Sequence, residues 1–274
     1  MLINGAFSDA LPASDRGLQY GDGLFETIAI IDGKPRQWQA HMARLASGCE
    51  ALQLPRANEE LLRDEALQLT KHTATAVLKI IITRGSGGRG YRFPAETAPT
   101  RILSIHPWPD YPATYAQQGI AITLCKTRLG CNPALAGIKH LNRLEQVLAR
   151  NEWQGDDIQE GLMLDHQGYI IEGTMSNLFM VEDDRLVTAD LSQCGVKGVM
   201  RETVIALAQQ HKIPVQIEPI NTDRLKAAPA CFVTNSLIGL WPVRQLDDIN
   251  YERSKITQDL IELLSEQQLI SGPN

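Results

Sequence analysis

The sequence has 274 residues, of which 43% are hydrophobic and 21% are charged, and its formal net charge is −6. This length allows one large domain or two smaller ones with a buried core. The mixed charges argue against a nucleic-acid surface, which needs a basic patch. No apolar run approaches the ~20 residues that cross a bilayer, and we expect no secretory signal at the N-terminus.

The N-terminal residues 1–106 are predicted to form an α/β domain. A strand, a tight turn at Asp32-Gly33 and a second strand are indicated within 24–36. A helix follows at 37–54, because apolar residues recur on one face of it. That face contains Trp38, Met42, Leu45, Cys49 and Leu52. A second helix is predicted at 57–72, and strands are predicted at 76–85 and 100–107.

Residues 107–118 are predicted to be an interdomain linker. Pro107, Pro109 and Pro112 lie close together there and argue against regular structure between 106 and 119. The second domain then covers 119–274. Its predicted strands are 119–126, 214–220 and 230–236, its hairpins are 161–173 and 177–189, and its helices are 138–153, 198–213 and 254–268. The fold class expected is mixed α/β (α+β), in two domains with antiparallel-rich sheets.

Lys139 is the first candidate for chemistry. Leu141, Leu144 and Leu148 follow it with the spacing of one helical face. A lysine just before a helix is usually solvated. Here the preceding residues are small and apolar, and partial desolvation would favour a neutral amine that bonds to a carbonyl.

Glu172 ends the predicted strand Tyr169-Ile170-Ile171. The ordinary interpretation is a strand-end glutamate in solvent. The functional interpretation is an acceptor for a protonated ring nitrogen. Both interpretations stay open from the residues alone.

Three segments have features of a phosphate site. Gly195 and Gly198 precede a helix, whose N-terminal N–H groups attract anions. Arg44 lies about 120° from the centre of its helix's apolar face, where it is either solvated or able to reach a phosphate. The segment Thr234-Asn235-Ser236 ends a strand with hydroxyl and amide groups. Each of these features alone is weak evidence for a phosphate site.

Residues 83–91 form a glycine-rich segment that contains Arg84 and Arg89. The segment lacks the ending of a nucleotide P-loop. A flexible loop that places an arginine against a carboxylate is one interpretation, and a purely structural loop is the other. The five cysteines are scattered, which is typical of reduced cytoplasmic thiols, and no cluster suggests a metal.

Several segments together resemble one family, the fold-type IV pyridoxal-phosphate enzymes, which include branched-chain aminotransferases, D-amino-acid aminotransferases and aminodeoxychorismate lyases. The segments are YGDGLFET (20–27), HMARL (41–45), GIKHLNRLEQVLAR (137–150), EGTMSNLF (172–179), GVMRE (198–202) and TNSL (234–237). The resemblance spans nearly the whole chain. RGSGGRGY and LAGIKHLNRLEQVL are similar to the bacterial lyases of this family in particular.

The resemblance implies a cytoplasmic homodimer whose C-terminal domain binds pyridoxal 5'-phosphate, with the active site between the domains. Lys139 would form the Schiff base and act in catalysis, and Glu172 would face the pyridine nitrogen. The resemblance also implies cofactor contacts at Arg44, Asn177, Gly198, Val199, Met200 and Ser236. Met200 stands where aminotransferases of the family usually have threonine, so backbone N–H groups must replace a hydroxyl.

The reaction implied is the conversion of 4-amino-4-deoxychorismate into 4-aminobenzoate and pyruvate in folate biosynthesis. The candidates for substrate binding are Arg84, Arg89, Tyr91 and Asn235. The nearest alternative is a D-amino-acid or branched-chain aminotransferase of the same fold. Two others are a non-catalytic vitamin-B6 binder, against which Lys139 and Glu172 argue, and an adaptor, which the modest charge and the lack of repeats do not favour.

Overall fold

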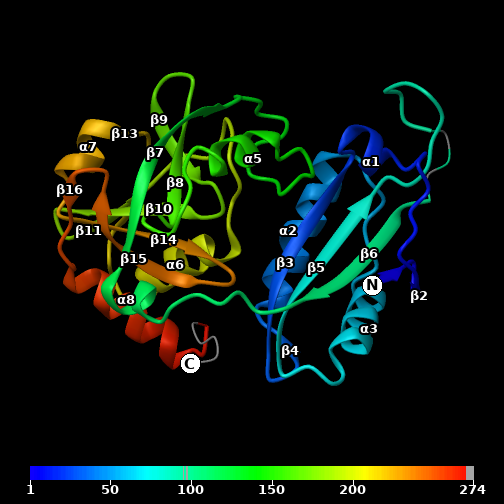
Figure 1. Cartoon of the computed structure of the whole chain (residues 1–274), viewed down its shortest axis with the longest axis horizontal. Helices are drawn as coiled ribbons and strands as arrows, with labels where there is room; N and C mark the ends of the chain where they lie inside the picture. The colour runs from blue at the N-terminus through cyan, green and yellow to red at the C-terminus, as the bar shows by residue number, and fades with distance from the viewer. Residues whose placement is uncertain (95, 97, 270–274) are drawn as a thin grey trace. The chain divides into compact units, whose positions relative to one another are not determined.

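The computed structural model describes residues 1–94, 96 and 98–269, and the chain divides into two compact units (Figure 1). One unit contains Met1–Pro109 and Ile138–Asn142, and the other contains Asp110–Gly137 and Arg143–Asn274. Positions 270–274 of the predicted second domain lie outside the described residues. Because 138–142 return to the first unit, Lys139 belongs there although its neighbours in sequence belong to the second.

The first unit is built on a six-stranded antiparallel sheet with the strand order β2-β1-β6-β5-β3-β4. Its two longer helices pack on the sheet, α2 against β3 and α3 against β6 (Figure 1). The elements are β1 (Leu2–Ile3), β2 (Ala6–Phe7), α1 (Arg16–Tyr20), β3 (Gly23–Ile31), β4 (Lys34–Pro35), α2 (Trp38–Ala51), α3 (Glu59–Thr70), β5 (Thr75–Thr83) and β6 (Thr100–His106).

Apolar periodicity explains why this unit folds as predicted. The expected apolar face of α2 is buried at its first four positions, with Met42 at 5% and Leu45 at 3% exposure, whereas Leu52 follows the helix as its C-cap and is half-buried. The predicted hairpin is confirmed as β3 and β4. Asp32 and Gly33 both have positive φ, 53° and 71°, which is the conformation that a two-residue hairpin turn requires.

The second unit contains a mixed ten-stranded sheet with the order β12-β11-β10-β14-β15-β7-β8-β9-β13, and β16 pairs with β15. Both predicted hairpins are confirmed as β8-β9 and β10-β11. The elements are α4 (Thr114–Gln118), β7 (Ile120–Leu129), α5 (Leu144–Arg150), β8 (Glu160–Asp165), β9 (Tyr169–Gly173), β10 (Asn177–Glu182), β11 (Arg185–Thr188), α6 (Val199–Gln210), β12 (Val215–Ile217), β13 (Ile220–Asn221), α7 (Thr222–Ala227), β14 (Ala230–Asn235), β15 (Gly239–Leu246), β16 (Ile249–Asn250) and α8 (Lys255–Glu266).

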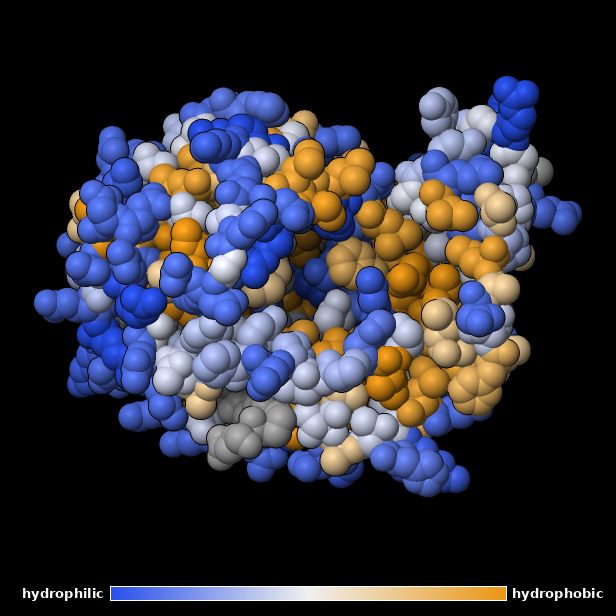
Figure 2. Space-filling view, viewed as in Figure 1, coloured by the Kyte–Doolittle hydropathy of each residue, from blue (hydrophilic) through white to orange (hydrophobic). Residues whose placement is uncertain are grey.

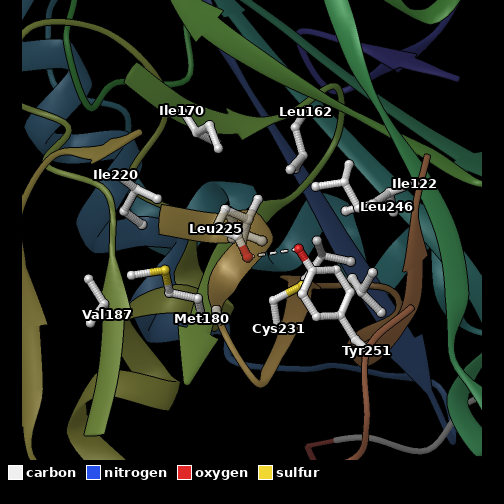
Figure 3. Packing of buried hydrophobic residues seen from close by; sticks show 14 of the residues in the cluster. Ile122, Leu162, Ile170, Met180, Val187, Ile220, Leu225, Cys231, Leu246 and Tyr251 are labelled. Carbon is white, nitrogen blue, oxygen red and sulfur yellow. Dashed lines mark hydrogen bonds between the residues drawn. The ribbon is translucent and has the colours of Figure 1, made fainter. Parts of the chain in front are cut away.

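A large apolar cluster fills the interior of the second unit (Figure 3). Tyr251 lies in this cluster and donates its hydroxyl proton to the carbonyl oxygen of Leu225 at 2.8 Å. A second cluster joins α6 and α8 to the sheet, and the rings of Phe179 and Phe232 stack in it with centroids 5.0 Å apart. These two clusters give the strands that carry site residues a rigid support.

The helix predicted over 138–153 is wrong in its first part, because α5 begins only at Leu144. Leu141 lies outside α5, so the three leucines do not form one helical face. Leu144, Val147 and Leu148 are 77%, 54% and 62% exposed. Figure 2 shows apolar atoms at the surface in the region of α5.

Two other predictions need correction. The helix α4 lies within the segment predicted to be irregular. Its residues all follow Pro112, so no proline interrupts it. The strand β15 was not predicted, because Pro242 lies in it. The parallel pairing of β15 with β7 begins at Val243, so Pro242 needs no donor toward β7.

Candidate active site

Lys139 lies in extended backbone that pairs with the start of β3. The Phe25 N–H donates to the Lys139 carbonyl oxygen at 3.0 Å, and the Leu141 N–H donates to the Gly23 carbonyl oxygen at 3.0 Å. This pairing replaces the predicted helix. The Lys139 side chain is half-buried, and its Nζ lies 4.4 Å from the centroid of the Phe25 ring. The amine is therefore held over an aromatic face on a fixed backbone rather than free in solvent.

Arg44 belongs to a buried cluster with Glu26 and His41. Its Nε donates to Glu26 Oε1 at 2.9 Å, and its Nη2 donates to Glu26 Oε2. His41 Nδ1 lies 2.7 Å from Glu26 Oε2, and both of these side chains are 1% exposed. Arg44 is therefore not a solvated residue on the flank of α2. Glu26 and His41 were not predicted from the sequence as site residues, although His41 and Arg44 have the i, i+3 spacing of helical neighbours.

Electrostatics define the charge state of this cluster. Burial raises the pKa of Glu26, but the hydrogen bonds and charges of Arg44 and His41 outweigh burial and hold it at about 2. Burial lowers the pKa of His41, and the positive charges of Arg44 and Lys139 lower it further against the opposing effect of Glu26. Glu26 is therefore ionised and His41 neutral near pH 7, and Lys139 and Arg44 share one electrostatic neighbourhood.

Arg84 is not placed to bind a substrate carboxylate. Its side chain is 2% exposed, and its guanidinium donates to Asp22 and to the carbonyl oxygens of Leu52 and Gln53 at 2.7–2.9 Å. The guanidinium also lies 3.7 Å from the centroid of the Phe93 ring. Arg84 therefore stabilises the 83–91 loop from its buried side. This agrees with the interpretation of the segment as a purely structural loop.

Arg89 and Tyr91 lie on the exposed part of that loop. Tyr91 is 84% exposed, and its ring centroid is 5.4 Å from that of Tyr20. The carbonyl oxygens of Gly90 and Tyr91 accept from the Arg16 guanidinium at 2.9 and 3.2 Å. The loop backbone is therefore anchored, while the Arg89 side chain is exposed.

In the second unit, Glu172 is buried rather than solvated. It is 4% exposed, its Oε2 accepts from the Val196 N–H at 2.7 Å, and its Oε1 accepts from Gln146 Nε2 at 3.3 Å. Gly195 approaches it closely at φ +84°, and a Cβ there would lie 2.7 Å from Ile171 Cγ2. The interpretation of Glu172 as a strand-end residue in solvent is therefore wrong.

Glu160 organises the turn that follows Glu172. This carboxylate is 1% exposed and accepts from the hydroxyls of Thr174 and Ser176, each at 2.6 Å. It also accepts from the Thr174 N–H at 3.0 Å. The turn thereby fixes the path from Glu172 to Asn177. No sequence pattern marks this glutamate as facing inward, because it begins its strand as an exposed residue often does.

Asn177 lies against the start of α6. Its Nδ2 donates to the Val196 carbonyl oxygen at 2.9 Å, and a Cβ on Gly198 would lie 2.1 Å from its Oδ1. Gly198 is the N-cap of α6 and offers no side-chain cap. The N–H groups of Val199 and Met200 therefore have no partner within the helix and present a site for an anion. The Met200 side chain is 1% exposed, so only its backbone faces this site.

The end of β14 adds a buried hydroxyl without a partner. Thr234 is 1% exposed, and within the described part of the chain its Oγ1 makes no hydrogen bond. Thr234 pairs with Asn177 across the sheet, so the two side chains share a face. Ser236 is half-buried. The Asn235 amide is engaged within the protein, donating to the Met175 carbonyl oxygen at 3.1 Å.

These features of the second unit fit a phosphorylated, ring-containing ligand. An uncapped helix start supplies N–H donors, and the buried Thr234 hydroxyl has no hydrogen-bond partner among the described residues. Glu172 supplies a buried carboxylate. Over residues 1–94, 96 and 98–269, no group of three or more His, Cys, Asp or Glu is placed to hold a metal. In the same ranges, no helix is long and apolar enough to span a membrane.

Comparison with known proteins places the chain in a family. The model of the amino-transferase class IV family matches residues 23–246. A 4-amino-4-deoxychorismate lyase from Pseudomonas aeruginosa has 44% identity and a TM-score of 0.95, over 98% of this chain and 99% of that one. The aminodeoxychorismate lyase of Vibrio harveyi is 36% identical over 262 residues, 94% of this chain and 97% of that protein.

A more distant relative has another activity in its name. The branched-chain amino acid aminotransferase of Escherichia coli is 25% identical, with a TM-score of 0.85 over 96% of this chain and 92% of that one. The chain therefore belongs to the class IV aminotransferase family. The predicted mixed α/β fold of type IV is confirmed.

Proposed function

We propose that this protein is a pyridoxal-phosphate-dependent lyase that converts 4-amino-4-deoxychorismate into 4-aminobenzoate and pyruvate. The observation that carries the proposal is the similarity to two such lyases along nearly the whole chain. Enzymes of this family depend on pyridoxal 5'-phosphate. The fixed amine of Lys139 and the buried carboxylate of Glu172 support this cofactor.

The cofactor would be held in the following way. Lys139 Nζ would bond to its aldehyde carbon, and Glu172 would pair with its pyridine nitrogen. The backbone at Gly198, Val199 and Met200 would bind the phosphate. Arg44 and Ser236 would assist there, and Asn177 would lie near the ring. The buried Glu26 would keep the Arg44 guanidinium in one orientation.

When bound, the cofactor supplies an electron sink for the carbon that bears the substrate amino group. Glu172 keeps the ring nitrogen protonated, because a nearby negative charge favours the cationic form. The Val196 N–H holds the Glu172 carboxylate in place at 2.7 Å.

Lys139 moves the protons. Its amine takes the proton from the substrate carbon that bears nitrogen, and it later gives a proton to the departing three-carbon enol, which becomes pyruvate. Formation of an aromatic ring drives this departure. General acid–base catalysis by one positioned group contributes typically about 10²–10⁴-fold to the rate. The backbone pairing of Lys139 with Phe25 keeps that amine in place.

The substrate carries two carboxylates, and cationic or polar groups must meet them. We propose Arg89, Tyr91 and Asn235 for this role and omit Arg84, whose donors are used inside the protein. The anchored backbone beneath Arg89 leaves its guanidinium exposed to a ligand.

An aminotransferase of the same fold is the second candidate, because the family model and the Escherichia coli relative carry that activity in their names. It shares the first proton abstraction and then needs a keto acid as second substrate. The discriminating experiment measures pyruvate release from 4-amino-4-deoxychorismate without a keto acid. Release at a steady rate supports the lyase. Amino transfer between amino and keto acids without such release would overturn it.

We further propose that the protein acts as a homodimer in the cytoplasm, in the synthesis of 4-aminobenzoate for folate. The exposed apolar residues Leu144, Val147 and Leu148 on α5 offer a surface that a second copy would cover. All five cysteines are free, as in proteins of a reducing compartment. Sedimentation of the purified protein tests the dimer.

A further inference from the structure

Two cysteines far apart in sequence lie together in the second unit. Cys131 is exposed, whereas Cys194 is 5% exposed. The Asn132 N–H donates to the Gln193 carbonyl oxygen at 2.8 Å, which joins the two segments next to these cysteines. The segments are therefore fixed against each other where the thiols meet.

The same segments are joined again a few residues further along. The Gly137 N–H donates to the Gly195 carbonyl oxygen at 2.9 Å, and the Lys197 N–H donates to the Gly137 carbonyl oxygen at 3.0 Å. Cys194 thus lies between these two backbone contacts, and Cys131 directly precedes the first of them. These contacts hold the two cysteine-bearing segments beside each other in the folded protein.

Electrostatic coupling between the thiols agrees with this placement. Burial raises the pKa of Cys194 to about 12, and the Cys131 thiol adds to the rise through its charge and a hydrogen-bonding contact. Burial also raises the pKa values of Cys49, Cys125 and Cys231, and the described groups that add to these shifts include no cysteine. Among the described residues, Cys131 and Cys194 are therefore the two cysteines whose thiols interact electrostatically.

We propose that Cys131 and Cys194 form a reversible disulfide when the protein meets a small disulfide oxidant such as glutathione disulfide. The exposed Cys131 loses its proton and attacks one sulfur of the oxidant, and the first glutathione leaves and takes up that proton. Cys194 then loses its proton and attacks the Cys131 sulfur, and the second glutathione leaves as a thiol. Two protein thiols are oxidised, and one glutathione disulfide is reduced to two thiols.

This disulfide would change the hydrogen bonding of the Glu172 carboxylate. Cys194 is two residues before Val196, whose N–H holds Glu172. Gly195 between them has no spare room, because a Cβ there would already lie 2.7 Å from Ile171. A bond that draws Cys194 toward Cys131 therefore moves the Val196 donor relative to Glu172. This regulatory effect rests on the proposed function, whereas formation of the disulfide does not.

Peptide mapping tests the modification. The protein with pyridoxal phosphate bound is incubated with glutathione disulfide, its remaining thiols are alkylated, and its peptides are identified by mass spectrometry. We expect a linked Cys131–Cys194 peptide that dithiothreitol removes, with Cys49, Cys125 and Cys231 alkylated. Cys131→Ser should give no linked peptide, and Cys194→Ser should leave glutathione on Cys131. Wild-type protein that carries only glutathione on Cys131, or that stays fully alkylated, would overturn the proposal.

Activity tests the regulatory part. A catalytic group misplaced by about 1 Å can cost about a hundredfold in rate, so a smaller shift should lower kcat/KM by about tenfold in the oxidised protein. Dithiothreitol should restore it, and Cys131→Ser should resist the oxidant. A linked protein with unchanged kcat/KM would refute the regulation. An inactive reduced protein would count against the proposed function and leave the mapping result intact.

Discussion

The Glu26→Gln variant should lose much of its stability at neutral pH. Glu26 is 1% exposed and bonded to Arg44 and His41, and its pKa falls from the ordinary 4.5 to about 2. At about 1.4 kcal/mol for each pKa unit, the ionised carboxylate stabilises the folded state by about 3 kcal/mol. Glutamine keeps the shape of the side chain and removes this charge, so the free energy of unfolding should fall by about this amount.

The sign of the pH dependence follows from the lowered pKa. The contribution of Glu26 is present in full above about pH 4.5 and is lost as the pH falls toward about 2. The difference between wild type and Glu26→Gln should therefore be largest near pH 7 and shrink as the solution becomes acidic. His41 adds to the acid sensitivity of the wild type, because its lowered pKa makes the unfolded chain bind more protons below about pH 6.5.

Urea unfolding followed by circular dichroism measures this difference. The control is Glu50→Gln, an exposed carboxylate on α2, the helix that carries His41 and Arg44, and it should change the free energy of unfolding by less than about 0.5 kcal/mol. Equal stability of Glu26→Gln and wild type at neutral pH would refute the reasoning. A difference that stays constant down to about pH 3 would refute its electrostatic part.

Three further variants test the candidate site. Glu172→Gln should fold and lower kcat/KM by about a hundredfold, because the ring nitrogen loses its anion, and near-normal turnover would contradict this. Thr234→Val should weaken pyridoxal-phosphate binding about fivefold in an absorbance titration without lowering the stability of the apoprotein, since its hydroxyl has no protein partner in the described ranges; unchanged affinity would show that the hydroxyl does not meet the cofactor. Arg89→Ala should lower kcat/KM at least about tenfold while Arg92→Ala does not, and equal values for both variants would remove Arg89 from the substrate site.

Much of the architecture follows from periodicity and turn chemistry that the sequence displays. The hairpin at Asp32 and Gly33, the helices α2 and α6 and the strand β9 lie where apolar spacing predicts them. The helix expected after Gly137 does not form in its first part, because backbone pairing of Lys139 and Leu141 with the start of β3 competes with it. Such pairing joins segments more than a hundred residues apart, which local patterns cannot reveal.

The candidate site divides in the same way. Glu172 and Lys139 could be predicted as site residues, because the sequence segments around them resemble family motifs. The supporting groups do not, because Glu26, His41 and Glu160 are ordinary charged or polar residues until burial and hydrogen bonds define them. Arg84 shows the opposite error. Arg84 was a candidate for substrate binding, and the fold turns its side chain inward onto Asp22.

The central claim is that the Lys139 amine bonds to pyridoxal phosphate. Borohydride reduction of the protein with the cofactor bound, followed by peptide mass spectrometry, tests it most directly. Lys79 provides an internal comparison, because its Nζ lies 5.5 Å from the centroid of the same Phe25 ring. We expect the pyridoxyl label on Lys139 alone. A label on Lys79, or a label that persists undiminished in Lys139→Ala, would contradict the claim.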